Sequence, residues 1–167
     1  MASPRPRRVL DTRAARLAAA DLLSRRAWTR RELATRLRRR GAPPEVAAEV
    51  VEDMVARGYV DDADFARHWV ETRTTRGYGA GRLRAELRAR GVAPPVIDKA
   101  LAPLTADRTL VAARAVAARR LPVLARGAPD RLAHRLADYL MRRGYAGSVV
   151  SRVVRDVTGA AGRPLEG

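Results

Sequence analysis

The chain has 167 residues and a formal net charge of +16 at pH 7, from 34 lysine and arginine residues against 18 aspartate and glutamate residues. Hydrophobic residues make up 47%, which is enough for a folded core, whereas the 4% share of aromatic residues argues against a β-sandwich or β-barrel and favours close-packed helices. Cysteine is absent, which excludes disulfides and cysteine-ligated metals, and no apolar run is long enough to cross a membrane, so we expect a cytoplasmic protein.

The positive charge is carried almost entirely by arginine, because Lys99 is the only lysine. Such an excess on a small protein creates a strong positive field, which favours binding to nucleic acid or to an acidic protein surface. The segment from Glu45 to Glu71 differs, with eight acidic residues and two arginines. These acids either pair with nearby arginines or form a second surface that contacts a protein. The candidate residues of this acidic patch are Glu45, Glu49, Glu52 and Asp53.

The first predicted helix runs from about Asp11 to Arg26. Its apolar residues recur at helical spacing, so we expect Leu17, Ala20 and Leu23 to face the core. The Thr-x-x-Glu sequence at residues 29–32 is typical of a capping box, in which a threonine and a glutamate satisfy free N–H groups at the start of the next helix.

The pattern Leu-x3-Leu-x3-Gly-x4-Val-x3-apolar-apolar then occurs three times. Its leucines form one stripe on a helix, and its glycine can adopt the left-handed conformation that ends that helix. Pro43-Pro44 and Pro94-Pro95 suit the first turn of the following helix, where a missing N–H costs nothing. The three sets are Leu33, Leu37, Gly41, Val46, Val50 and Val51; Leu83, Leu87, Gly91, Val96, Ala100 and Leu101; and Leu136, Leu140, Gly144, Val149, Val153 and Val154.

One further helix precedes the second and third copies, from about Asp62 to Arg76 and from Thr105 to about Arg120. A longer insertion at residues 121–129 predicts a flexible connection. We therefore predict an all-α fold of three tandem three-helix repeats, stacked into an elongated curved array because each repeat alone exposes apolar edges. The predicted parts are a flexible basic arm at residues 1–10, repeats at residues 11–60, 61–104 and 105–157, and a flexible tail at residues 158–167.

No motif predicts catalysis. The chain has no Walker-type phosphate loop, and the glycine-rich stretch Gly77–Gly81 has no strand before it, so we interpret it as a turn. Asp61, Asp62 and Asp64 resemble a carboxylate cluster for Mg²⁺, as in a nuclease, but their place before a predicted helix favours capping. The two histidines lie far apart. We therefore predict a protein that is not an enzyme and has no metal site and no cofactor.

Several segments resemble the RecX family of RecA-modulating proteins. The most specific are GYVDDADFA at residues 58–66 and LLSRRAWTRREL at residues 22–33. The pattern Leu-x3-Leu-x2-Arg-Gly at residues 83–91 resembles the middle element of the family, and residues 136–154 resemble its C-terminal copy. The resemblance covers residues 12 to 157.

This resemblance implies three repeats similar to helix-turn-helix units, in a protein that binds within the groove of the RecA–DNA filament. The family inhibits ATP hydrolysis, strand exchange and coprotease activity by RecA. The implied partners are the RecA filament and single- and double-stranded DNA, with no membrane, and we expect a monomer. The family has no catalytic residues to carry over.

The arginines on the second helix of each repeat are the candidate contacts with DNA and RecA, although each could instead be solvated or complement a helix dipole. The alternative is a tandem helix-turn-helix factor that acts on DNA alone, but its helices lack the asparagine and glutamine side chains that read bases. Trp28 and Tyr78 could stack on bases, although we expect them to pack against their turns. The candidate arginines are Arg36, Arg38, Arg39, Arg40, Arg84, Arg88, Arg90, Arg135, Arg142 and Arg143.

Overall fold

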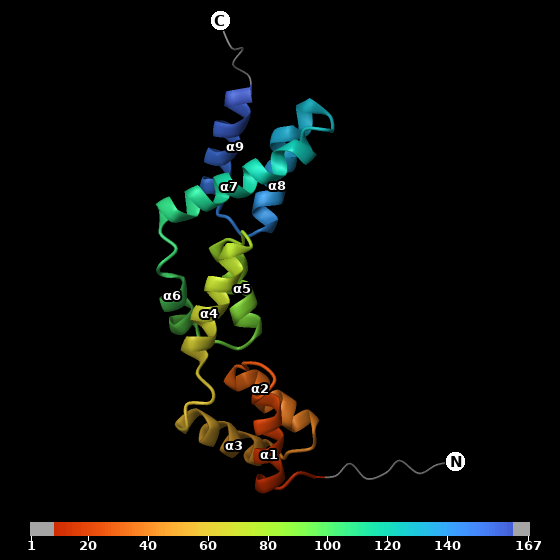
Figure 1. Ribbon diagram of the computed structural model, residues 1–167, viewed down its shortest axis with the longest axis vertical. Coiled ribbons are helices and arrows are strands. Elements are labelled where there is room, and N and C mark those ends of the chain that lie inside the picture. Colours follow the sequence, from red (N-terminus) through yellow and green to blue (C-terminus); the bar gives the residue numbers. More distant parts are fainter. Residues whose placement is uncertain (1–8, 162–167) are drawn as a thin grey trace, which may run out of the picture. The chain divides into compact units, whose positions relative to one another are not determined.

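The computed structural model describes residues 9–161, and over this range it confirms the predicted all-α fold (Figure 1). Residues 1–8 of the predicted basic arm and residues 162–167 of the predicted tail lie outside the described residues. None of the helices within residues 9–161 combines the length and apolar character of a membrane span. The elements are α1 (Thr12–Leu23), α2 (Arg30–Arg39), α3 (Pro44–Ala56), α4 (Asp62–Thr75), α5 (Ala80–Ala89), α6 (Pro94–Leu101), α7 (Ala106–Leu124), the short 3₁₀ helix η1 (Pro129–Arg131), α8 (Leu132–Arg142) and α9 (Gly147–Ala161).

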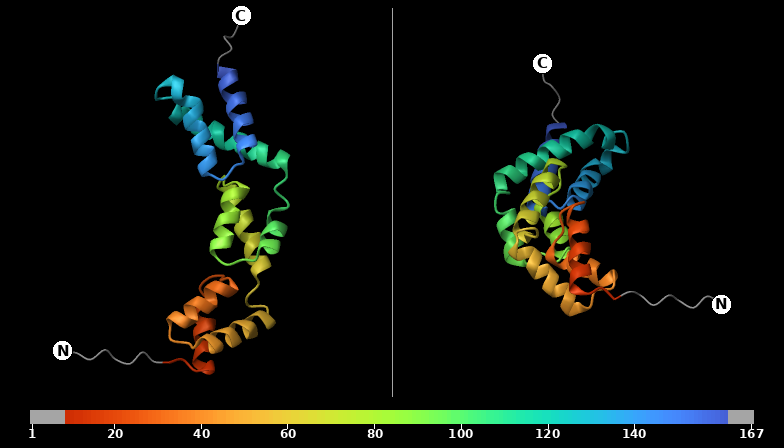
Figure 2. Two further views of the ribbon diagram at one scale, coloured as in Figure 1. Left: turned by 180° about the vertical axis from the view of Figure 1, so that it is seen from behind. Right: turned by 60° about the horizontal axis from the view of Figure 1, so that its bottom comes forward.

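The leucine pairs of the repeat form the centres of the packed helices. In the first repeat, α1, α2 and α3 pack against one another around Leu33 and Leu37, which are fully buried. In the third repeat, α7, α8 and α9 pack against one another around Leu136 and Leu140, which are also fully buried. Both views in Figure 2 show these three helices close together. The predicted apolar stripes are therefore confirmed at these positions.

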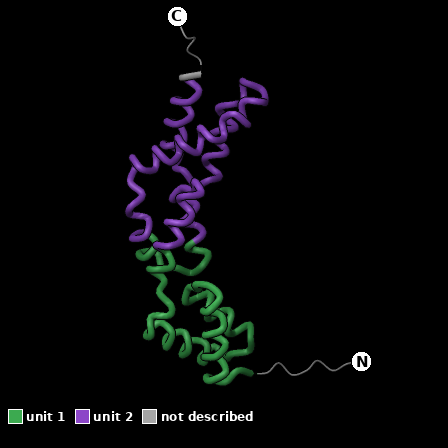
Figure 3. The backbone as a smooth tube through the Cα atoms, in the orientation of Figure 1, with its two compact units in different colours: residues 1–66, 87–97 green, residues 67–86, 98–167 purple. Residues whose placement is uncertain are grey.

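The described residues form two compact units, residues 9–66 with 87–97 and residues 67–86 with 98–161 (Figure 3). Their boundary divides α4, α5 and α6, so the second repeat contributes residues to both units. This division is consistent with a repeat that buries its apolar surface against each neighbour. The curvature predicted for the array stays a prediction.

The repeat glycines end α2, α5 and α8, as the sequence predicts. Gly41, Gly91 and Gly144 have φ values of +105°, +82° and +88°, in the left-handed region that glycine tolerates best. The residue after each glycine is buried and donates its N–H to the carbonyl of the second repeat leucine, which is the Schellman arrangement. The bonds run from Ala42 to Leu37 at 3.0 Å, from Val92 to Leu87 at 3.1 Å and from Tyr145 to Leu140 at 3.3 Å.

Two predicted helix starts are also confirmed. The Thr29 hydroxyl accepts a hydrogen bond from the Glu32 N–H at 3.2 Å, and the Glu32 carboxylate accepts one from the Thr29 N–H at 3.4 Å, which completes the capping box. Asp61 caps α4, because its Oδ1 accepts hydrogen bonds from the N–H groups of Ala63 at 2.8 Å and Asp64 at 3.1 Å. Capping therefore accounts for Asp61 without a bound cation.

The face of α1 that packs inward differs from the predicted one. Leu17 is 68% exposed and Ala20 is also exposed, so the prediction is wrong for these two residues. The buried stripe consists instead of Ala15, Ala19 and Leu22. An alanine-rich helix offers two apolar stripes, and alanines in the contact allow neighbouring helices to approach more closely than leucines do.

The helices of the third repeat run further than the sequence indicates. Helix α7 continues to Leu124 and contains Pro122 in its last turn, where proline forfeits one hydrogen bond of the helix. The break between α7 and η1 is therefore shorter than the connection predicted at residues 121–129. Helix α9 continues to Ala161, through the first residues of the segment for which a tail was predicted.

Residues of the first two repeats meet at the N-terminus of α2, within the first compact unit. We call this contact the first junction, and it consists of residues 29–32 with Asp62, Arg90 and Gly91. The buried Thr29 hydroxyl donates a hydrogen bond to the Arg90 carbonyl at 2.7 Å, and the Arg90 guanidinium forms an ion pair with Glu32. Asp62 Oδ1 accepts a hydrogen bond from the Arg30 N–H, the first of α2, at 2.9 Å.

A second junction lies within the other compact unit, between residues 76–82 and residues 143–145. The N–H groups of Gly79 and Gly81 donate to the carbonyls of Arg143 at 2.7 Å and Gly144 at 3.0 Å. In return, an Arg143 guanidinium nitrogen donates to the Arg76 carbonyl at 2.6 Å. The Tyr145 hydroxyl donates to the Gly77 carbonyl at 3.3 Å, and burial raises the pKa of this hydroxyl, which keeps it a donor.

Candidate nucleic-acid interface

The candidate arginines of α2 fall into two groups. Arg36, Arg38 and Arg39 are exposed along the last turns of the helix. Among the described residues, Arg36 and Arg38 form no ion pair. Arg40 instead reaches Asp21 of α1, with Nη1 3.3 Å from Oδ2. Arg40 therefore has a structural partner, whereas Arg36 and Arg38 can meet a ligand without first breaking an ion pair.

The candidate arginines of α5 divide in the same way. Arg88 is exposed and forms no ion pair within residues 9–161. Arg84 forms an ion pair with Asp98 of α6, and the Arg90 side chain is only 29% exposed beside Glu32. Arg90 belongs to the first junction, so its guanidinium is already held by a carboxylate.

Two of the three candidates near α8 hold backbone carbonyls. Arg135 donates to the Ala128 carbonyl at 2.9 Å, and its Nε is buried without a hydrogen-bond partner among the described residues. Arg143 donates across the second junction to the Arg76 carbonyl. Arg142 is exposed and has no carboxylate partner in the part of the chain that the structure describes.

A further cluster of arginines lies between α4, α7 and α8, and only Arg143 among its members was predicted from the sequence as a contact. Arg76, Arg119, Arg120 and Arg143 line a hollow of about 340 Å³ together with Tyr139, and no acidic residue lines it. The guanidinium carbons of Arg120 and Arg143 lie 5.2 Å and 4.9 Å from the Tyr139 ring centre. We call this set the arginine hollow. Guanidinium groups gathered without carboxylates are suited to bind phosphate, because each presents a planar fork of N–H donors.

The arginine hollow could not be found from local sequence. Arg119-Arg120 is one of several arginine pairs in the chain, and Arg76 lies in a different repeat. Only the packing of α7 beside the turn after α4 brings them together. That approach depends on Gly77, because a Cβ built there would lie 2.6 Å from a Val116 methyl carbon and 3.2 Å from an Arg143 nitrogen.

The acidic patch on α3 is largely compensated within its own unit. Arg16 lies 3.5 Å from a Glu49 oxygen and 3.3 Å from an Asp53 oxygen, and Arg30 forms an ion pair with Glu52. The hydrogen bond from Arg57 lowers the pKa of Asp53, despite the opposing effect of burial, with further help from the charges of Arg57 and Arg16. Of the four candidates, Glu45 alone has no such partner among the described residues. The geometry therefore favours internal pairing over a free contact surface.

The two aromatic candidates pack as expected. The Trp28 indole N–H donates to the Leu22 carbonyl at 2.9 Å, and the Arg26 guanidinium stacks 3.3 Å from the ring centre. Tyr78 is half-buried, with the Arg82 guanidinium 4.1 Å from its ring centre. Each ring therefore already has a guanidinium group close to it, which leaves less of its surface for a base.

Within residues 9–161, no three His, Cys, Asp or Glu side chains are grouped so that they could hold a metal ion. His134 lies 3.4 Å from Asp138 on the exposed surface of α8, a spacing of one helical turn. Asp61 and Asp62 are occupied by helix N-termini. The described residues therefore gather guanidinium groups in the arginine hollow but contain no assembled group of metal-binding side chains.

Comparison with known proteins agrees with this architecture. Three successive parts of the sequence match the RecX first, second and third three-helix domains, at residues 15–54, 61–101 and 107–154. The regulatory protein RecX of Halorhodospira halophila is 44% identical over 139 residues, covering 82% of this chain and 84% of the relative. The regulatory protein RecX of Mycolicibacterium vanbaalenii is 40% identical over 140 residues, covering 80% and 76%.

Solved structures support the fold. The crystal structure of RecX from Lactobacillus salivarius matches with a TM-score of 0.78 at 16% sequence identity, covering 88% of this chain and 96% of the other. A second crystal structure of a regulatory protein RecX matches with a TM-score of 0.79 at 22% identity, covering 85% and 72%. The relatives are named as regulators and not as enzymes. On its sequence and its three-domain order, the chain belongs to the RecX family of regulatory proteins.

Proposed function

We propose that this protein binds the RecA–DNA filament in its groove and inhibits or modulates ATP hydrolysis, strand exchange and coprotease activity by RecA. It binds single- and double-stranded DNA directly through arginine-rich surfaces. It acts in the cytoplasm as a monomer. Membership of the RecX family is the observation that carries the regulatory role.

The direct binding of DNA is supported by how the arginines are partnered. The protein has a net charge of +16, yet many of its arginines neutralise carboxylates in its own fold. Those without a carboxylate partner among the described residues include exposed side chains on α2, α5 and α8 and the side chains of the arginine hollow. Guanidinium groups that do not neutralise a carboxylate support phosphate contacts, which position a protein on nucleic acid without reading its sequence.

The regulatory proposal is tested by RecA-catalysed ATP hydrolysis on single-stranded DNA with increasing amounts of the purified protein. We expect hydrolysis to slow at substoichiometric to equal amounts relative to RecA. Binding to bare DNA, RecA-coated DNA and free RecA, measured side by side, separates the two sources of affinity. Unchanged hydrolysis over this range contradicts the regulatory proposal, and binding to bare DNA alone favours the helix-turn-helix alternative.

The DNA-binding proposal is tested by the salt dependence of binding to bare single-stranded DNA. The double variant Arg119→Gln/Arg120→Gln removes two charges from the arginine hollow, and Arg25→Gln is the matched control because Arg25 is exposed but paired with Asp21. We expect the slope of log affinity against log salt to fall by about 0.7 for each phosphate of the single strand that the variant no longer neutralises. Equal slopes for the double variant and the control contradict a phosphate-binding role of the hollow.

A further inference from the structure

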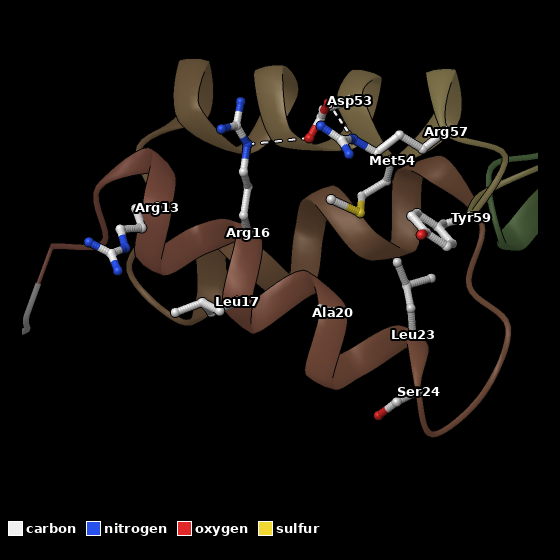
Figure 4. Close-up of a pocket in the computed structure, with 10 residues that line it drawn as sticks. All are labelled: Arg13, Arg16, Leu17, Ala20, Leu23, Ser24, Asp53, Met54, Arg57 and Tyr59. Atoms are coloured by element: carbon white, nitrogen blue, oxygen red, sulfur yellow. Dashed lines mark hydrogen bonds and ion pairs between the residues drawn. The ribbon is translucent and has the colours of Figure 1, made fainter.

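A second concave site lies in the first compact unit, on the side of α1 that the sequence predicts to be buried. It is a groove of about 740 Å³ between α1 and α3, shown in Figure 4. Leu17, Ala20 and Leu23 line it from α1, Met54 lines it from α3, and Tyr59 closes the end near Leu23. Its lining is therefore mainly apolar, although it faces solvent.

Leu17 and Tyr59 are among the most exposed large hydrophobic side chains in residues 9–161. Leu17 is 68% exposed and Tyr59 is 65% exposed. Tyr59 follows Gly58 in a Schellman turn, where its N–H donates to the Met54 carbonyl at 2.9 Å. Hydrophobic residues at this position commonly contact the end of their own helix, and the matching residues after α2, α5 and α8 are all buried. Tyr59 thus presents to solvent a ring of the kind that anchors protein interfaces.

The charges around the groove are mostly positive. Arg13, Arg16 and Arg57 line it against a single acid, Asp53. Arg16 and Arg57 neutralise that carboxylate, as the dashed lines in Figure 4 show. Arg57 uses only its Nε for this bond, so its terminal nitrogens make no hydrogen bond among the described residues, and its side chain is 61% exposed. Arg13 is exposed and has no ion pair in the described part of the chain.

We propose that this groove binds an acidic amphipathic helix of a partner protein. Apolar residues one and two turns apart on such a helix would cover Leu17, Leu23 and Tyr59, and glutamates or aspartates beside them would meet Arg13 and Arg57. This is the helix-in-groove mode of recognition. A second copy of this chain fits less well, because a symmetric contact would place the same arginines opposite one another.

This inference goes beyond the proposed function. Binding of an acidic helix, measured without RecA or DNA, neither requires an effect on the RecA filament nor tests one. The two proposals can therefore fail independently of each other.

The experiment uses the full chain and three fluorescein-labelled peptides in anisotropy titrations at about 0.15 M salt, where long-range charge attraction is screened. The first peptide is an amphipathic helix with leucines on one face and glutamates beside them. The second has the same composition in scrambled order, and the third has lysine in place of every glutamate. We expect the acidic amphipathic peptide to bind at least about tenfold more tightly than either of the others, an effect of the size that one interface anchor contributes.

Substitutions in the protein locate the binding. Leu17→Glu adds a repelling charge to the groove and, because Leu17 is exposed, should leave the helical circular dichroism and the melting temperature unchanged. The matched control is Val111→Glu, since Val111 is 65% exposed on α7 and does not line the groove. We expect Leu17→Glu to abolish the preference for the acidic amphipathic peptide and Val111→Glu to keep it.

Three results would overturn the proposal. Equal binding of the scrambled peptide would show attraction to net charge alone, and equal binding of the lysine peptide would remove the role of the arginines. A dimer in sedimentation that Leu17→Glu dissociates would assign the groove to a second copy of the chain.

Discussion

The two junctions between repeats place the same parts of the fold in contact but hold them by different chemistry. At the first junction, side chains make the contact, with the Thr29 hydroxyl on the Arg90 carbonyl and Glu32 on the Arg90 guanidinium. At the second junction, the N–H groups of Gly79 and Gly81 bond directly to the carbonyls of residues 143 and 144. In each case the start of the second helix of one repeat contacts the end of the second helix of the next repeat: α2 contacts α5 at the first junction, and α5 contacts α8 at the second.

This difference shows how one repeated geometry can be reached by two kinds of sequence. A capping box leaves the threonine hydroxyl hydrogen free to donate, so Thr29 can cap α2 and bond to the next repeat at the same time. Glycines have no such side chain and instead let two backbones approach. A Cβ built on Gly79 would lie 2.6 Å from the Gly144 carbonyl oxygen. The first junction should therefore be sensitive to polar side chains and the second to any added atom.

The largest expected effect comes from adding one methyl group at the equivalent glycines. Both Gly144→Ala and Gly91→Ala force alanine into a left-handed conformation, which costs about 1–2 kcal/mol. At Gly144 the new Cβ would also lie 2.3 Å from the backbone nitrogen of Arg82. At Gly91 it would lie 2.1 Å from Cδ and 2.6 Å from Cβ of Arg31, and of these two atoms the outer one can move more easily than the Cβ. We expect the Gly144→Ala variant to lose about 4 kcal/mol of unfolding free energy and Gly91→Ala a smaller amount, about 3 kcal/mol.

The losses of the Gly91→Ala and Gly144→Ala variants are measured by denaturant unfolding in chains that keep only one tryptophan as the fluorescent probe. The chain has two tryptophans, and Trp28 lies in the first compact unit whereas Trp69 lies in the second. Gly147→Ala is the control, because a Cβ at Gly147 meets no atom within 4 Å. Equal losses for Gly144→Ala and Gly91→Ala would show that backbone contact does not distinguish the junctions.

The next largest effect concerns the buried hydroxyl of the first junction. Thr29→Val keeps the shape of the side chain but removes the acceptor for the Glu32 N–H and the donor to the Arg90 carbonyl. We expect a loss of about 2 kcal/mol, which the Thr29→Ser variant should largely recover. Thr105→Val is the comparison, because the Thr105 hydroxyl is exposed and caps α7 by a bond to Arg108 within the same turn. We expect this variant to lose about 1 kcal/mol of unfolding free energy or less. A Thr29→Val loss no larger than that of Thr105→Val would contradict the junction role.

The elements of the fold were predictable because their signals are local. Leu33, Leu37 and Gly41 define a helix and its end within nine residues, and the same pattern in the other repeats gives the same structure. The buried face of α1 was not predictable in this way. Ala15 and Ala19 compete with Leu17 for the core, and only the close approach of the neighbouring helices decides between them.

The arginines were predictable as a class but not one by one. Arg90 and Arg88 look alike in the sequence, yet Arg90 meets Glu32, which lies 58 residues earlier, and Arg88 meets solvent. The arginine hollow combines Arg76 with Arg119 through the packing of α7. Whether an arginine binds a ligand or supports the fold depends on such distant partners, which helical periodicity does not reveal.

Replacing Glu86, which lies beside the second junction, should have a smaller effect on stability, and this effect should depend on pH. Burial raises the pKa of this carboxyl, but hydrogen bonds from Arg82 and from the Trp69 indole lower it by more. The pKa of Glu86 in the folded chain therefore lies below the ordinary 4.5. A lowered pKa means that ionised Glu86 stabilises the fold above about pH 4.5, and that this contribution is lost as the pH falls through the folded-state pKa.

We therefore expect Glu86→Gln to lose about 1 kcal/mol at neutral pH and to approach the stability of the parent chain under acidic conditions. Thermal unfolding followed by circular dichroism across this pH range measures both values. Glu45→Gln is the control, since Glu45 is exposed and has no ion pair among the described residues. A constant difference between Glu86→Gln and the parent at every pH would contradict the role of the charge.

The smallest effect on stability should come from removing the charge of Asp62 at the first junction, and it should be a gain where the other variants lose stability. Burial raises the pKa of Asp62, and this outweighs the hydrogen bond from the Arg30 N–H, so the ionised carboxylate is less favourable in the folded chain than in the unfolded one. This cost is present above the raised folded-state pKa and disappears once both states are protonated, below the ordinary 3.8. Asp62→Asn keeps an oxygen acceptor for Arg30 without the charge, so we expect a gain of less than about 1 kcal/mol at neutral pH and none at low pH.

Asp62→Ala separates the acceptor from the charge, because it removes both. We expect it to lose about 1 kcal/mol at neutral pH, as other losses of a helix cap do. Denaturant unfolding read from Trp28, which lies in the same compact unit, measures both variants. If Asp62→Asn were less stable than the parent at neutral pH, the attraction between the carboxylate and the N-terminus of α2 would exceed the cost of its burial. The first junction would then depend on charge as well as on hydrogen bonds, a second way in which it differs from the backbone contacts of the other junction.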